Sequence, residues 1–181
     1  KTTLLKVIAN ILRPNKGKVI VRGRIAPILE LGIGFHPDLT ARENISVYGS
    51  IMGLKGNEVK ERMDSILAFA GLEKFRDAKL KSFSSGMQMR LAFSVAAETN
   101  PDIYLIDEAL AVGDIEFYRK CIDKFEQIKE EKKTILLVSH DMKLMENFCD
   151  RTMFLSRGEM MFLGDSGEAI ERYVEHMAGR K

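Results

Sequence analysis

The sequence predicts an α/β fold in which helices cover both faces of a parallel β-sheet. From Ser84 onward, short apolar runs such as DIYLID and TILLVS alternate with segments of helical periodicity, which is typical of βαβ units. These runs are apolar almost throughout, as strands buried on both faces must be. The stretch from about 40 to 80 is mostly helical and predicts a separate helical layer.

The amino-terminal part of the chain predicts one helix followed by one strand. Leucine and isoleucine recur at helical spacing after Lys1, and Pro14 stops the pattern. The segment KVIVRGRI at 18–25 is expected to be a strand. Taken alone, KTTLLK is the first turn of a helix. Whether its first three residues are instead the end of a phosphate-binding loop is open at this point.

Two helices are predicted between 40 and 72. Thr40 is the expected N-cap of the first helix, because Glu43 follows three residues later and completes a capping box. The second helix has the sequence NEVKERMDSILAFAGL, with Asn57 as its expected N-cap and Gly71 at its end. Its expected buried stripe comprises Val59, Met63, Ile66, Leu67 and Ala70.

The remaining predicted elements alternate between helix and strand. They are a helix from Ser84 to about Asn100, a strand at 102–107, a helix from about Ile115, a strand at 134–139, a helix at 142–149, strands at 151–156 and 160–163, and a closing helix. No internal repeat, low-complexity segment or long linker interrupts this series. We therefore expect one domain over 1–181.

Composition is that of a globular protein with a sizeable core, because 45% of the 181 residues are hydrophobic and 30% are charged. The net charge is only +2, and Lys and Arg are scattered among acids, so no basic stripe indicates nucleic-acid binding. The longest apolar stretches, such as 91–97, fall far short of the roughly 18 residues of a spanning helix. We expect membrane contact only through a partner. No secretory signal is visible, and the start at Lys1 suggests that the true beginning is absent.

The two cysteines, Cys121 and Cys149, each lie on the apolar face of a predicted helix. Neither has a second Cys or a His at metal-ligand spacing. Two reduced thiols in the core of a cytosolic protein are the preferred interpretation.

Two adjacent carboxylates end the predicted strand IYLIDE. Ligands of parallel sheets bind at the carboxyl ends of the strands, and consecutive residues there point in different directions. Asp107 is therefore a candidate to hold Mg²⁺ through water, and Glu108 to polarise an attacking water. The competing interpretation is a pair of loop acids that cap the next helix.

Two further polar segments have both a functional and a structural interpretation. His140 follows the strand TILLVS and either contacts a ligand at the same sheet edge or caps the next helix. Ser84, Ser85 and Gly86 lead into a helix, where free backbone N–H groups and the helix dipole favour an anion. Taken alone, a plain serine N-cap is the better interpretation of that segment.

The order and spacing of these motifs resemble the nucleotide-binding domain of ATP-binding cassette (ABC) transporters over essentially the whole chain. Lys1, Thr2 and Thr3 match the end of the P-loop pattern G-x-x-x-x-G-K-[ST]. FSSGM matches the signature motif and IYLIDE matches Walker B. Asp114 matches the D-loop and His140 the switch histidine. The resemblance implies an α/β P-loop NTPase fold with a helical subdomain at about 38–98 and a RecA-like core from 1–30 and about 99–165.

The resemblance also implies how ATP and Mg²⁺ are bound between two such domains facing head to tail. Glu108 and His140 are the implied catalytic residues, the first orienting water and the second contacting the γ-phosphate. The implied nucleotide-binding residues are Lys1, Thr2, Thr3, Ser84, Ser85, Gly86 and Asp114, the last four acting across the dimer interface. Thr2 and Asp107 are the implied magnesium ligands.

The chain departs from the family pattern in three places. The signature reads Phe-Ser-Ser-Gly-Met where Leu-Ser-Gly-Gly-Gln is commonest. The glutamine that ligates Mg²⁺ is absent, and Glu30 or Leu31 stands in its place, so Glu30 is a candidate replacement. The P-loop glycines and the first strands are also missing, and we expect the chain as written to bind ATP weakly or not at all.

The sequences of three segments, GFHPDLTARENI, LIDEALAVGDIEFYRKC and VSHDMKLMENFCDR, resemble those of the subfamily that exports polysaccharides, O-antigen or teichoic acids. This resemblance implies a homodimer bound to transmembrane permease subunits at the cytoplasmic face of the cell membrane, with no nucleic-acid partner. Phe35, His36 and Leu39 are expected to line the groove that receives the permease, although local packing of their loop explains them equally well. Two alternatives are an ABC-type ATPase of another export or non-transport system and a nucleotide-free docking module.

Overall fold

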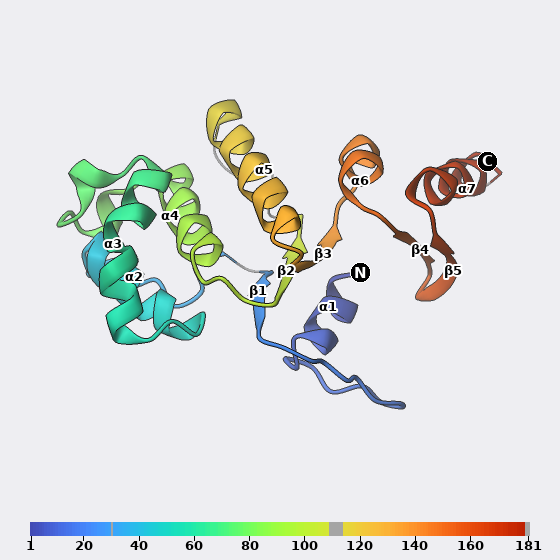
Figure 1. Cartoon of the computed structure of the whole chain (residues 1–181), viewed down its shortest axis with the longest axis horizontal. Coiled ribbons are helices and arrows are strands. Elements are labelled where there is room, and N and C mark those ends of the chain that lie inside the picture. The colour runs from blue at the N-terminus through green and yellow to red at the C-terminus, as the bar shows by residue number, and fades with distance from the viewer. Residues whose placement is uncertain (30, 109–113, 180–181) are drawn as a thin grey trace.

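The computed structural model describes residues 1–29, 31–108 and 114–179 (Figure 1). Its main sheet is parallel and contains β1 (Ile25–Ile28), β2 (Ile103–Asp107) and β3 (Thr134–Val138), in that order. Ile25 pairs with Ile103, which pairs with Thr134. Tyr104, Leu105 and Ile106 in the central strand are at most 1% exposed. The predicted parallel sheet of apolar strands is thus confirmed.

The last two strands form a sheet of their own. β4 (Thr152–Ser156) and β5 (Glu159–Gly164) pair antiparallel, and the order of hydrogen-bonded strands does not connect them to β3. One face of this hairpin packs on α7 (Ser166–Ala178), where the Phe154 ring lies 5.3 Å from Tyr173 and 5.2 Å from His176 between centroids. The hairpin and α7 stand together at the right of Figure 1, beyond α6 (Met142–Phe148).

A helical layer lies at the other end of the molecule, at the left of Figure 1. It consists of α2 (Ala41–Ile51), α3 (Gly56–Ala70) and α4 (Ser85–Ala97), with the short 3₁₀ turns Glu73–Phe75 and Leu80–Ser82 between the last two. The α3 stripe Val59, Met63, Ile66, Leu67 and Ala70 is buried as predicted. Gly71 ends α3 with a φ of +68°, which glycine adopts without strain.

The helical layer and the sheet share one hydrophobic core, and Phe93 of α4 lies within it. Phe93 is fully buried. Its ring centroid lies 6.2 Å from that of Phe69 in α3, and 5.9 Å and 5.6 Å from those of Phe117 and Phe125 in α5 (Ile115–Glu130). The aromatic cluster therefore joins α3, α4 and α5.

Helix caps follow the sequence prediction at Thr40 but not at Asn57. Thr40 Oγ1 accepts the Glu43 N–H at 3.4 Å, and the Glu43 carboxylate accepts the Thr40 N–H at 2.8 Å, which confirms the capping box. The prediction of Asn57 as the α3 cap is wrong, because α3 begins at Gly56 after Lys55. The Glu58 carboxylate accepts the Lys55 N–H at 2.7 Å and so allows the helix to start two residues earlier.

The prediction of a strand at 18–25 is also wrong. The strand begins only at Ile25, since the backbone turns at Gly23 with a φ of +118°. A Cβ atom on Gly23 would lie 2.8 Å from the Cβ of Asp102, so the close approach requires glycine. Val19 and Ile20 upstream are 43% and 68% exposed.

The opening helix is shorter than its apolar pattern. α1 covers Thr2–Ile8 and ends before Asn10, which has a φ of +59°. Ile11 and Leu12, the last members of the pattern, are 57% and 43% exposed. Over the described ranges, the structure contains no helix that is both long and apolar enough to cross a membrane.

Candidate functional site

Glu108 and His140 lie together at the carboxyl edge of the parallel sheet. β2 and β3 are neighbours, and the Glu108 N–H donates to the carbonyl of Val138 at 2.9 Å, which fixes the backbone beyond Asp107. His140 Nδ1 lies 3.5 Å from Glu108 Oε1. Both side chains face solvent, with 82% of His140 and 52% of Glu108 exposed. The site is therefore open to a ligand from solution.

Glu108 has a φ of +53°, a left-handed conformation that residues other than glycine rarely adopt. Asp107, the preceding residue, still belongs to β2 and is half-buried. The backbone conformation therefore changes between Asp107 and Glu108, and consecutive residues of such different conformation suit the different roles predicted for them. Backbone strain of this kind is concentrated at functional sites.

Lys1 lies on the same side of the molecule as His140. Lys1, Ser139 and His140 line a cavity of about 120 Å³. Thr2 and Thr3 form the first turn of α1 and are exposed. The predicted phosphate-contacting lysine is thus brought near the predicted switch histidine.

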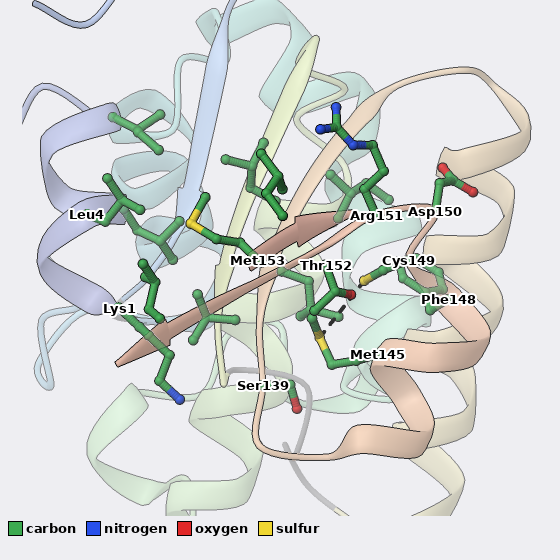
Figure 2. Close-up of a pocket in the computed structure, with 18 of the residues that line it drawn as sticks. Lys1, Leu4, Ser139, Met145, Phe148, Cys149, Asp150, Arg151, Thr152 and Met153 are labelled. Carbon is green, nitrogen blue, oxygen red and sulfur yellow. Dashed lines mark hydrogen bonds between the residues drawn. The ribbon is translucent and has the colours of Figure 1, made fainter. Parts of the chain in front are cut away.

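A second cavity, of about 420 Å³, adjoins this region and is drawn in Figure 2. Its walls come from α1, α6 and the strands β3 and β4, and they are mostly apolar. Figure 2 shows the Lys1 ammonium and the Ser139 hydroxyl at the same end of the cavity, and the sulfur atoms of Met145 and Cys149, 3.9 Å apart, farther along. Because phosphates need N–H donors or cations, the end with Lys1 suits a phosphate group, and Lys129, Lys133 and Arg151 line the cavity elsewhere.

The Ser84–Gly86 segment forms the exposed amino-terminal end of α4. Ser84 is the N-cap, and its Oγ accepts the Met87 N–H at 3.2 Å. Ser85 is exposed and Gly86 is partly exposed, so the first backbone N–H groups of the helix are open to an anion. Across the described residues, no hydrogen bond joins this segment to Lys1, Glu108 or His140, so a single chain does not unite all the predicted site residues.

Asp114 is the N-cap of α5 and also binds a side chain of α4. Its Oδ1 accepts the Phe117 N–H at 2.9 Å, and its Oδ2 forms an ion pair with Arg90 Nη2. The hydrogen bond from the Phe117 backbone, assisted by the charge of Arg90, lowers the pKa of the Asp114 carboxyl. Sequence reasoning placed Asp114 at a dimer interface and missed its contact within the chain.

Arg90 is the residue that sequence reasoning overlooked. It is the single charged residue of α4, SGMQMRLAFSVAA, and its guanidinium lies 5.5 Å from the centroid of the Phe117 ring. In the sequence, the only sign that Arg90 has a specific contact is that it is a single charge on a mostly apolar helix. That signal does not identify a partner 24 residues away.

The remaining predictions concern Glu30, the metal site and the two cysteines. Glu30, the candidate replacement for the missing glutamine, lies outside the described residues, as does the segment 109–113. Within the part of the chain that the structure describes, no group of three or more His, Cys, Asp or Glu side chains is arranged to hold a metal ion. Cys121 is buried and Cys149 half-buried, and both are free thiols.

The family match and similar curated proteins agree with each other. Residues 1–111 match a protein family described as ABC transporter. The O-antigen export system ATP-binding protein RfbB of Klebsiella pneumoniae is 44% identical over 178 residues, which cover 98% of this chain and 72% of that protein. The teichoic acids export ATP-binding protein TagH of Shouchella clausii is 38% identical over 98% of this chain, which spans only 49% of that protein's length.

Solved structures resemble the fold over nearly its full extent. A dimeric post-hydrolysis state of an ATP-binding cassette bound to ADP and Pi matches with a TM-score of 0.74 and 26% identity, covering 91% of this chain and 80% of that one. The ATP-binding subunit of an ABC transporter matches with a TM-score of 0.81 at 22% identity, covering 96% of this chain and 77% of that one. The second similarity concerns the fold alone.

Proposed function

The chain belongs to the ABC transporter family, and we propose that it is the ATP-binding and ATP-hydrolysing part of a subunit that drives export of a polysaccharide, O-antigen or teichoic acid. The observation that carries the proposal is the contact of His140 with Glu108 at the sheet edge, beside the cavity that Lys1 lines. Relatives named for O-antigen and teichoic acid export support the choice of cargo.

Each polar group at the edge has a distinct part in hydrolysis. Glu108 accepts a hydrogen bond from the attacking water and aligns it with the γ-phosphate. The His140 imidazole, oriented by its contact with Glu108, donates to the γ-phosphate oxygens, whose negative charge Lys1 neutralises. Thr2 and Thr3 at the start of α1 place hydroxyl groups beside the same phosphates. Catalysis of this kind depends on positioning and charge far more than on covalent chemistry.

The residues at the edge fit a magnesium ion that arrives with the nucleotide. Mg²⁺ keeps several waters and is usually held by one or two carboxylates together with phosphate oxygens. The half-buried Asp107 carboxylate and the Thr2 hydroxyl are a donor set of this type, and the described residues offer no all-protein cage that competes with it. When bound, the ion would neutralise charge on the phosphates.

Two copies facing head to tail complete the site. In one chain the Ser84–Gly86 helix end is exposed and separate from Glu108 and His140. In a dimer, Ser84, Ser85 and Gly86 of one copy donate backbone and hydroxyl hydrogen bonds to the γ-phosphate held by the other. Asp114 stands near the same interface. A dimeric, ADP-bound relative supports this arrangement.

The loop at 33–39 is the proposed docking site for a transmembrane permease. Buried Asn44 accepts the His36 N–H at 2.7 Å and donates to the carbonyls of His36 and Leu39, both at 3.1 Å, so the loop is held rigidly. Phe35 packs edge-on against Tyr48 with centroids 5.1 Å apart, whereas His36 is exposed. Local packing therefore accounts for the aromatic side chain of Phe35. We keep His36 and Leu39 as residues that line the proposed permease-binding groove.

Exposed apolar side chains in and beside this loop extend the docking surface. Ile33, Val47 and Ile51 are 55%, 41% and 58% exposed. Ile33 belongs to the loop, whereas Val47 and Ile51 lie on α2 in the helical layer, which we assign to a subdomain at about 38–98, with the core at 1–30 and about 99–165. Through this contact the subunit would sit peripherally at the cytoplasmic face of the membrane.

The decisive experiment measures Mg-ATP hydrolysis by the purified full-length protein and its Glu108→Gln variant. Hydrolysis by the native protein and its loss in the variant, with ATP binding retained, is the expected result. Glu130→Gln is the matched control, because Glu130 is exposed and lies at the carboxyl end of α5, the opposite end of that helix from Asp114. Equal, negligible turnover of native protein and variant would favour a nucleotide-free docking module. Turnover without loss of surface polymer on gene deletion would favour another ABC-type system.

A further inference from the structure

Two segments that the proposed dimer presents to the neighbouring copy are tied to each other within one chain. Ser84–Gly86 begins α4, and Asp114 begins α5. Arg90 stands six residues after Ser84, about 9 Å along the helix axis. Its guanidinium forms an ion pair with Asp114 and covers the Phe117 ring, one turn into α5.

We propose that Arg90 is a positioning residue that holds the Ser84–Gly86 end of α4 and Asp114 in fixed register, so that both enter the neighbouring copy's nucleotide site as one unit. The inference rests on the proposed dimeric ATPase function and extends it to a residue outside the nucleotide contacts. Arg90 itself touches neither Glu108 nor His140 by any hydrogen bond in the described ranges.

The geometry of the contact supports positioning better than stabilisation. The Arg90 side chain is 29% exposed and that of Asp114 is 58% exposed, so solvent screens the pair and its worth in folding is small. Arginine nevertheless makes a directional contact, because its planar fork binds a carboxylate while its face stacks on an aromatic ring. Asp114 uses its other oxygen to cap α5, which fixes the direction of its carboxylate.

Both helices are rigid beyond this contact. Leu91, Phe93 and Val95 of α4 are fully buried, and the Phe93 ring packs against Phe117 of α5. Ser84 and Ser85 at the start of α4 are exposed, although Phe83 just before them is buried in the core. Arg90 lies between the two parts, where a link to α5 limits the freedom of the exposed end.

The test compares full-length Glu108→Gln protein with the full-length Glu108→Gln/Arg90→Ala double variant, since blocking hydrolysis allows binding and dimerisation to be measured separately. ATP binding to the monomer is measured by calorimetry at low protein concentration, and ATP-driven dimerisation by sedimentation velocity. We expect unchanged ATP affinity of the monomer and a dimer weakened by about 10-fold or more. Arg90→Lys, which keeps the charge but loses the fork, should restore only part of the dimerisation.

Lys120→Ala in the same background is the matched control, because Lys120 forms an exposed ion pair with Glu116 on α5. Unchanged dimerisation in the Arg90→Ala variant, or an equal loss in the Lys120→Ala control, would overturn the inference. A fall in monomer affinity or a large fall in melting temperature would also overturn it, since either indicates a structural role. If the Glu108→Gln protein itself neither binds ATP nor dimerises with it, the proposed function fails first.

Discussion

The imidazole of His140 lies 3.5 Å from the carboxylate of Glu108, although the two residues are separated by a whole helix and strand. The contact exists because β2 and β3 are parallel neighbours, so their carboxyl ends meet at one edge of the sheet. Both side chains are exposed, so a water molecule and a phosphate group arriving from solution at this edge would each meet one of them.

Replacing His140 with alanine should lower the turnover of ATP by about 100-fold, within the usual range for a positioned proton donor or acceptor. ATP affinity of the full-length protein should change little, because Lys1 and the first turn of α1 are untouched. Steady-state ATPase assays and nucleotide titration measure the two quantities. The control is His176→Ala, since His176 contacts Phe154 in the carboxyl-terminal hairpin unit. A similar loss of turnover in both variants would contradict a specific role of His140 in ATP hydrolysis.

Replacing Phe93 with alanine should destabilise the protein by about 3–5 kcal/mol, because the ring is fully buried and leaves a cavity that α3, α4 and α5 surround. Urea unfolding followed by circular dichroism measures this loss. Phe75→Ala provides the comparison, as Phe75 is 43% exposed and should cost much less. Equal losses at the two positions would mean that the core is not centred on Phe93.

Replacing Asn44 with alanine should detach the loop at 33–39 from α2. The side chain is fully buried and satisfies the carbonyls of His36, Leu39 and Thr40, which the substitution leaves without this donor. The expected cost is about 1–3 kcal/mol, together with loss of permease binding in a pull-down assay. Asn57→Ala, at an exposed position, is the matched control. Retained permease binding by a folded Asn44→Ala protein would argue against docking at this loop.

The Cys121 thiol should resist alkylation in the native protein. Burial raises its pKa to about 12, so the reactive thiolate is scarce at pH 8. Cys149, half-buried and also with a raised pKa, should react first when iodoacetamide labelling is followed by mass spectrometry. Rapid labelling of Cys121 without denaturant would contradict the buried position.

The same thiol links stability to pH. Because the pKa of Cys121 is higher in the folded than in the unfolded chain, its contribution is fully present below the ordinary thiol value of 9.0 and is lost as pH rises toward about 12. Urea midpoints between pH 8 and pH 11 should fall less in Cys121→Ser than in the native protein. An identical fall in both would show that other groups govern the alkaline loss.

Elements whose signals are local could be predicted from the sequence. The Thr40–Glu43 capping box and the buried stripe of α3 each depend on residues within a few turns of one another. The strand β2 was recognised because an unbroken apolar run is required wherever a strand is covered on both faces, and β3 was recognised by the same pattern although its residues are only partly buried. Order and spacing of short motifs sufficed to indicate the family, and the comparisons confirm it.

Contacts between distant segments were decided by the tertiary structure. The strand expected at 18–25 is shortened because Gly23 packs against Asp102, and Asp114 binds Arg90 of another helix. Periodicity and capping describe a residue's neighbours along the chain, whereas these contacts depend on where the sheet and the core bring separate segments. The sequence alone therefore indicated which residues are candidates to bind phosphate, and folding determined that His140 meets Glu108 while Ser84–Gly86 faces outward.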